Sequence, residues 1–60
     1  MSDIKLYAER DGHRLTLAPV DDLAFAAAIG ESPEWPEGYD LVAVMPDGRV
    51  LVYEDDWVEM

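Results

Sequence analysis

Two alternating hydrophobic runs in the first third of the chain predict a β-hairpin. Residues 3 to 9 and 14 to 18 flank the turn, where Asp11-Gly12 is a strong signal for a two-residue connection. The register that this turn sets gives the hairpin one apolar face and one polar face. The expected cross-strand pairs are Ala8 with Leu15, Leu6 with Leu17, Glu9 with Arg14 and Tyr7 with Thr16.

The next segment predicts a short helix over residues 20 to 29, with acids in its first turn and Gly30 as its C-terminal stop. At about 100° per residue, its small side chains share a face that suits close packing on a sheet. The members of that face are Val20, Leu23, Ala24 and Ala27. Phe25 and Ile29 point the other way. They either pack under the loop at 31 to 38, against Trp35, or form an exposed patch beside Asp21 and Asp22. We expect them to pack under the loop, because a large exposed apolar patch is a liability.

A second hairpin is predicted from two further hydrophobic runs, 39 to 45 and 49 to 54. Pro46-Asp47-Gly48 joins them and favours a type I turn with Gly48 as a left-handed bulge. One face then pairs Val44 with Val50 and Val42 with Val52, and the other carries Leu41, Ala43, Leu51 and Tyr53. The predicted fold is a single acidic α+β domain over residues 1 to 60. Its order is β-β-α-β-β, with two antiparallel hairpins in one sheet and one short helix packed on it.

Composition supports a folded domain with a thin core. A chain of 60 residues buries only about 60% of the surface that it exposes when unfolded, but 50% hydrophobic residues are too many for a disordered chain. There are no cysteines, no secretory signal pattern and no run of about 20 apolar residues. We therefore expect a cytoplasmic protein that does not associate with membranes, and a monomer.

The negative charge is concentrated in the second half of the chain. Residues 1 to 30 carry five acids and three Lys or Arg, whereas residues 31 to 60 carry nine acids and one Arg, within a total formal charge of −10. Such a polyanion is repelled by nucleic acid and by anionic lipid. The charge predicts a basic protein partner and no direct binding to nucleic acid.

The inventory of reactive side chains argues against catalysis. The only histidine, His13, lies beside a turn, and Ser2 and Ser32 have no base near them in sequence. The acids Glu54-Asp55-Asp56 lack the spacing of a calcium loop, and neighbouring strand residues point to opposite faces. We expect no enzyme activity, no metal site and no cofactor.

An acid opposite an acid is the feature that points to a binding surface. Asp40 lies opposite Glu54 in the bulged register and opposite Asp55 in a two-residue register, and like charges across a hairpin are destabilising. Proteins tend to keep such conflicts at functional sites, although a short acidic run can also be a solvated terminus that aids solubility. The predicted partner-binding residues are Asp40, Glu54, Asp55, Asp56, Glu59, Glu37, Glu34 and Trp57.

The two tryptophans allow two interpretations, since each lies just outside a predicted element. A flanking tryptophan in a small domain can cap the core, or it can serve as a binding anchor. We expect Trp57 to be partly buried and to pin residues 55 to 60 as an acidic extension of the fourth strand. Val58 would then add a smaller contact, and Asp55, Asp56 and Glu59 would stay in solvent.

In size, charge and interleaving of aromatic and acidic residues, the chain resembles the small acidic phage proteins that inhibit bacterial defence. It looks most like the DNA-mimic anti-CRISPR proteins directed at type I systems. The resemblance implies a non-enzymatic inhibitor, acting in the host cytoplasm, that blocks a basic DNA-binding surface of the type I surveillance complex, on its large subunit. The alternatives are an antitoxin or immunity-type protein that covers the basic site of a toxin or nuclease, and a structural protein whose charge only keeps it soluble.

Overall fold

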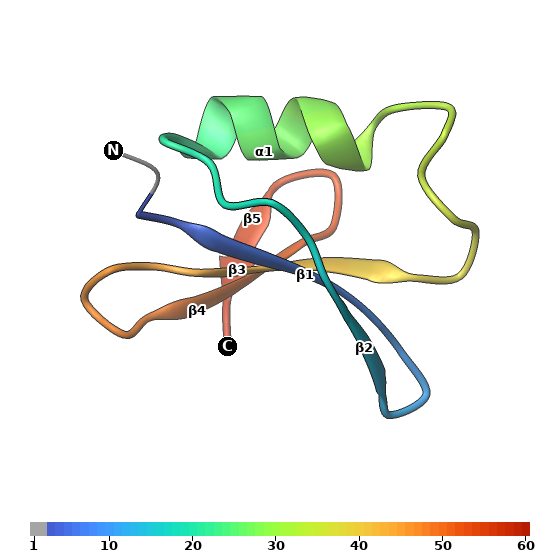
Figure 1. Ribbon diagram of the computed structural model, residues 1–60, viewed down its shortest axis with the longest axis horizontal. Coiled ribbons are helices and arrows are strands. Elements are labelled where there is room, and N and C mark those ends of the chain that lie inside the picture. Colours follow the sequence, from blue (N-terminus) through green and yellow to red (C-terminus); the bar gives the residue numbers. More distant parts are fainter. Residues whose placement is uncertain (1–2) are drawn as a thin grey trace.

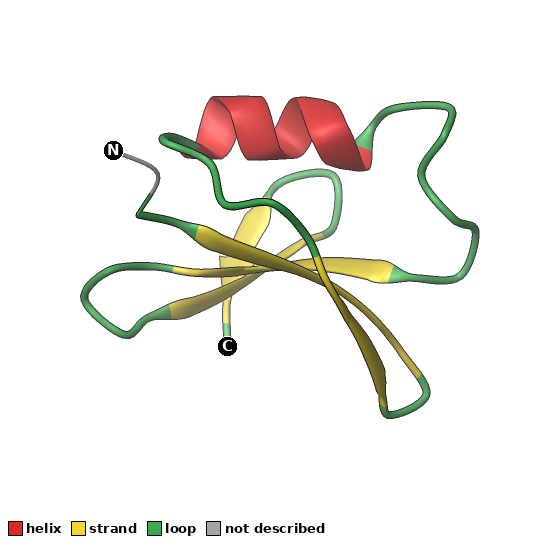
Figure 2. Cartoon of the chain, viewed as in Figure 1, coloured by secondary structure: helices red, strands yellow, loops and turns green. Residues whose placement is uncertain are grey.

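A single antiparallel sheet carries one helix on one of its faces (Figure 1). The computed structural model describes residues 3 to 60. The strands are β1 (Lys5–Arg10), β2 (His13–Thr16), β3 (Asp40–Val44), β4 (Val50–Tyr53) and β5 (Trp57–Glu59), and the helix is α1 (Leu23–Gly30). The strand order is β2-β1-β3-β4-β5. The predicted β-β-α-β-β order is confirmed, and a fifth strand follows it; Figure 2 shows the helix lying alone over the sheet.

The first hairpin has the predicted register. Tyr7 pairs with Thr16, Ala8 with Leu15 and Glu9 with Arg14. Asp11 and Gly12 both have positive φ, 47° and 85°. These angles give a two-residue turn whose twist matches that of the two strands it joins. The pairing extends past the strand end, because the Leu17 N–H donates to the Leu6 carbonyl at 3.0 Å.

The helix begins three residues later than predicted. Val20 is paired with Ile4 through two backbone hydrogen bonds of 2.9 and 3.0 Å, so it belongs to the edge of the sheet. Asp22 then caps the helix by accepting a hydrogen bond from the Phe25 N–H at 2.7 Å. The prediction missed this start because the bridge to Ile4 is a long-range contact that the local pattern does not reveal.

The later start also changes which side chains face the sheet. Ala26 is fully buried, whereas Ala24, which we expected on the packed face, is exposed. Ile29 packs partly against the core, as expected for its place near Trp35. Phe25 does not; it is 61% exposed beside Pro19 and Asp22, so the prediction that it packs under the loop is wrong.

The second hairpin confirms the predicted bulged turn. Val44 pairs with Val50 and Val42 with Val52, while Gly48 has a φ of 95°. The turn is closed by the Gly48 N–H, which donates to the Met45 carbonyl at 2.9 Å. The helix covers the sheet face that carries Leu6, Leu41, Ala43 and Leu51, and these residues form the core with Ile4, Val20 and Ala26.

The C-terminal segment reverses direction instead of extending the fourth strand. Asp55 has a φ of 65°, a left-handed conformation that Asp tolerates better than most residues, and the Glu54 N–H donates to the Asp56 carbonyl at 2.8 Å. Trp57 consequently pairs with Tyr53, and β5 runs antiparallel to β4. The predicted extension is therefore wrong. Within residues 3 to 60, no helix has the length and apolar character needed to cross a membrane.

Candidate functional site

The sheet register collects four acids at one end of the sheet. Asp40 opens β3 and pairs with Glu9 of β1. The last pair of the β3–β4 ladder is Leu41 with Tyr53. Asp40 precedes Leu41 and Glu54 follows Tyr53, so both acids lie just beyond the same end of this ladder. Asp55 and Asp56 follow in the turn to β5. We call Asp40, Glu54, Asp55 and Asp56 the acidic end.

The arginines of the chain are paired with other acids. Arg14 contacts Glu9 at 2.8 Å, Arg10 lies 3.7 Å from Asp11, and Arg49 contacts Asp47 at 2.8 Å. The Arg14 guanidinium also stacks 4.6 Å above the Tyr7 ring. Among the ion pairs within the described part of the chain, none involves the acidic end. Its carboxylates are exposed and are left available to an outside cation.

The turn that carries these acids is fixed from both sides by Trp57. The Trp57 indole N–H donates to the Leu23 carbonyl of α1 at 3.3 Å, and its ring lies 5.0 Å from the Tyr53 ring at a tilt of 55°. Within the turn, Asp56 accepts a hydrogen bond from the Trp57 N–H at 2.8 Å. The expected positions are confirmed for Trp57, which is half-buried, and for Asp55, Asp56 and Glu59, which stay in solvent. Val58 is 49% exposed.

The Tyr53 hydroxyl links a further acid to this end. Burial raises the pKa of Tyr53, and the hydrogen bond to the Glu31 carboxylate and the negative charges of Glu31, Asp55 and Asp56 raise it further. Glu31 is the C-cap of α1, where a negative charge opposes the helix dipole. Sequence reasoning did not select Glu31, and no local pattern could have done so, because the orientation of α1 over the turn brings it there.

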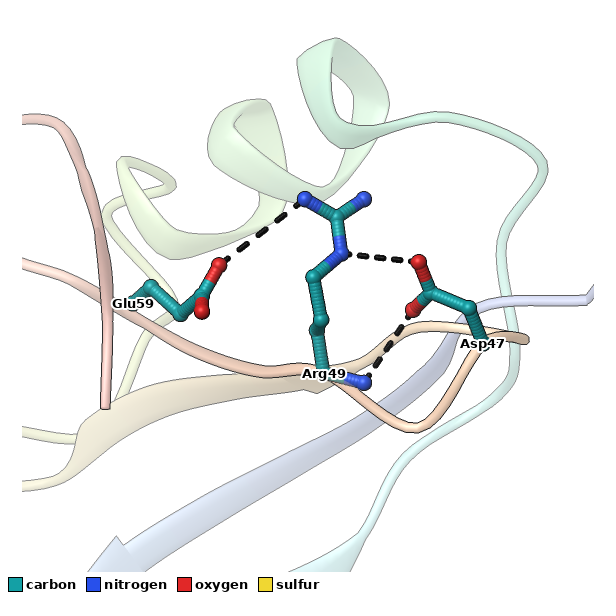
Figure 3. Close-up of polar contacts among 3 residues, drawn as sticks. All are labelled: Asp47, Arg49 and Glu59. Carbon is teal, nitrogen blue, oxygen red and sulfur yellow. Dashed lines mark hydrogen bonds and ion pairs between the residues drawn. The ribbon is translucent and has the colours of Figure 1, made fainter.

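The remaining predicted residues lie elsewhere. Glu59 is at the far end of β5, 3.8 Å from Arg49, which also binds Asp47 (Figure 3). In that turn, hydrogen bonds from the Arg49 backbone N–H lower the pKa of Asp47, and the Arg49 side chain adds to the effect. Glu37 and Glu34 are exposed in the loop that precedes β3. The structure therefore gathers four of the seven predicted acids and leaves Glu59, Glu37 and Glu34 apart from them.

A largely apolar pocket of about 370 Å³ lies beside this loop. Its walls come from β2 and the segment after it, from α1 and from the loop itself. The side chains that line it include Leu15, Leu17, Ile29, Ser32, Glu34 and Trp35. The Trp35 indole N–H donates to the Tyr39 carbonyl at 3.0 Å, which holds that wall of the pocket in place.

The titratable side chains of the described residues lie at or near the surface. Within residues 3 to 60, no group of three or more His, Asp or Glu side chains is arranged to hold a metal ion. No polar or charged residue of this part of the chain is buried. His13 is exposed at the start of β2. What this geometry can do is present fixed negative charge.

Comparison with known proteins adds no family. No family model matches the chain. No curated protein and no solved structure matches it either.

Proposed function

We propose that the chain is a non-enzymatic inhibitor that competes with DNA for a basic protein surface. The observation that carries the proposal is the acidic end, where four exposed carboxylates have no ion-pair partner in the described part of the chain. Three of them, Glu54, Asp55 and Asp56, lie on the turn anchored by Trp57, and Asp40 opens β3. Lys and Arg grooves that bind duplex DNA mostly contact phosphates and do not depend on sequence. Carboxylates can occupy such a groove.

The charge density is of the right order for a mimic of this kind. The molecule is 28 Å long, and a duplex of that length carries about 16 phosphates at one charge per ~1.7 Å. The chain has a formal charge of −10 over the same length. Its net charge per length is thus more than half that of DNA.

Rigidity favours the same function. A free acidic tail would lose about 1 to 2 kcal/mol of backbone entropy per residue on binding. Here the turn is already held by the Trp57 contacts with Leu23 and Tyr53, so that ordering is completed during folding. Asp40 lies directly opposite Glu9 in the β1–β3 ladder, and like charges in that position are destabilising, as expected of a surface that serves a partner.

The target that we propose is the DNA-binding surface of a type I CRISPR surveillance complex, on its large subunit. This part of the proposal rests on the resemblance in size, charge and aromatic-acidic interleaving. It implies a monomeric inhibitor acting in the cytoplasm of the host cell.

The test is a competition between the chain and duplex DNA. A purified type I surveillance complex is mixed with fluorescently labelled target duplex, and DNA binding is followed by anisotropy as the chain is added. We expect the chain to abolish DNA binding, and its apparent affinity to fall steeply as salt is raised. If the complex with the chain bound takes up duplex DNA as well as the free complex does, the mimicry is refuted. Inhibition of a toxin nuclease, with no effect on the surveillance complex, would favour the antitoxin alternative.

A further inference from the structure

The outer edge of β2 is unpaired. β2 is the first strand in the sheet order, and its neighbour is β1 alone. The hydrogen bond from Leu17 N–H to Leu6 O identifies Leu6–Leu17 as a hydrogen-bonded pair, so Ala8–Leu15, two residues on, is one as well. The N–H and C=O groups of the residues between, Arg14 and Thr16, therefore point away from β1. Within residues 3 to 60, no strand pairs with them.

The pocket beside the loop lies next to this edge. Leu15, which is 48% exposed, and Leu17 point to the helix side of the sheet and form one wall. Ile29 and Trp35 form the opposite wall, and the bond from the Trp35 indole to Tyr39 fixes the larger of the two. A strand added to β2 would direct alternate side chains to the helix side, and hence toward the pocket.

The charges around the pocket indicate the charge of the segment that it can bind. The loop at 31 to 38 contains Glu31, Glu34 and Glu37 and no Lys or Arg, and Glu34 lines the pocket itself. The only arginine of β2, Arg14, is turned to the other face of the sheet, where it binds Glu9 and stacks on Tyr7. Arg10 of β1 lies over the Tyr39 ring at the end of this loop, and its charge is paired with Asp11. A second copy of the chain, with a formal charge of −10, would be repelled. A cationic segment would be attracted.

We propose that the β2 edge and this pocket bind an extended segment of a partner protein that carries one large apolar side chain and a Lys or Arg two residues away from it. The segment adds to the sheet through the backbone groups of Arg14 and Thr16. Its apolar side chain fills the pocket between Leu15 and Trp35, and a Lys or Arg two residues along, on the same side of the added strand, pairs with Glu34. This site uses elements other than the acidic end and does not depend on the function proposed above.

The experiment selects seven-residue peptides from a fully randomised display library against the intact chain and measures the affinity of enriched peptides by anisotropy. Thr16→Pro removes the outward N–H while leaving the bonds to β1, and an edge strand tolerates proline at such a position. Thr16→Val is its control, because it keeps the N–H. Leu15→Gln alters the pocket wall, and Val58→Gln, at a site of equal exposure on the other edge strand, is the matched control.

We expect enriched peptides to carry one large apolar residue with a Lys or Arg two residues away from it. Their affinity should fall at least tenfold for Thr16→Pro and for Leu15→Gln, and should not change for Thr16→Val or Val58→Gln. Leu15→Gln keeps the test decisive if the proline variant fails to fold. A selection that enriches nothing, or peptides that bind Leu15→Gln as well as the original chain, would overturn the proposal. So would a dimer in sedimentation equilibrium that Thr16→Pro converts to a monomer, since a second copy would then occupy the edge.

Discussion

Replacing Trp57 with Ala should remove a large part of the stability of the fold. Trp→Ala at a fully buried site costs about 3 to 5 kcal/mol, and Trp57 is half-buried. The ring contact with Tyr53 adds about 0.5 to 1.5 kcal/mol, and the long indole bond to Leu23 adds less than about 1 kcal/mol. Halving the burial cost and adding these two contributions gives an expected loss of about 2 to 5 kcal/mol, out of the roughly 3 to 9 kcal/mol typical of a domain of this size.

The assay is urea unfolding followed by circular dichroism and by the fluorescence of Trp35. In a parallel thermal melt, the melting temperature should fall by about 10 °C or more, since each kcal/mol shifts it by about 4 to 8 °C in a domain this small. Trp57→Phe keeps the ring contact and should lose only about 1 kcal/mol. Val58→Ala, at a site 49% exposed, should change stability by less than about 0.5 kcal/mol. A Trp57→Ala variant as stable as Val58→Ala would refute the anchoring role.

Trp57 should also matter for binding through the acids that it holds in place. Trp57→Ala should weaken inhibition by releasing the turn, so its effect should largely vanish in a background where Asp55 and Asp56 are already neutral. In a Trp35→Phe variant, the emission of Trp57 should be blue-shifted in the folded chain relative to the unfolded chain. Emission typical of water-exposed indole would mean that Trp57 is not docked.

Three further predictions follow from particular contacts. Gly30→Ala should destabilise the chain by about 1 kcal/mol in urea unfolding. A Cβ at Gly30 would lie 2.7 Å from Leu41 Cδ2, and this overpacking outweighs the gain in helix propensity. An unchanged urea midpoint would contradict that contact. The pKa of Tyr53 is raised above 10.0, so its contribution to stability is complete below about pH 10 and is lost as pH rises through the folded-state value. Urea midpoints from pH 8 to 11 should therefore fall less for Tyr53→Phe than for the original chain, and parallel profiles would count against the raised pKa. Added NaCl should raise the melting temperature, because it screens the repulsion among the carboxylates of the acidic end. The rise should be smaller for Glu54→Gln. A melting temperature that falls with salt would argue against repulsion at the acidic end.

The two hairpins could be predicted because their turns are local chemistry. Asp11-Gly12 can adopt the two positive φ angles of its turn, and Gly48 supplies the bulge after Pro46-Asp47. Each turn fixes the register of its strands, and alternation then assigns the faces. The pairing of Val42 with Val52 followed from these residues alone.

What could not be predicted depends on long-range contacts. Val20 fits the helix pattern, but its backbone pairs with Ile4, and this moves the helix start and the buried face. The short β5 was hidden by the acids before it, since the reversal depends on the left-handed conformation of Asp55. The proximity of Glu31 to the acidic end depends on where α1 crosses the sheet, which no local pattern encodes.

The most direct test of the account is the inhibition constant of the double variant Asp40→Asn, Glu54→Gln in the competition with duplex DNA. Its control is Asp3→Asn, Glu59→Gln, which removes the same charge at the opposite end of the sheet. Opposed like charges cost about 0.2 to 1 kcal/mol, so neutralising Asp40 and Glu54 should leave the fold intact and raise its melting temperature. We expect inhibition by this variant to weaken at least tenfold, while the control inhibits almost as well as the original chain. Equal inhibition by the two variants, or a loss of stability together with inhibition in the first, would contradict the claim that the acidic end is the binding surface.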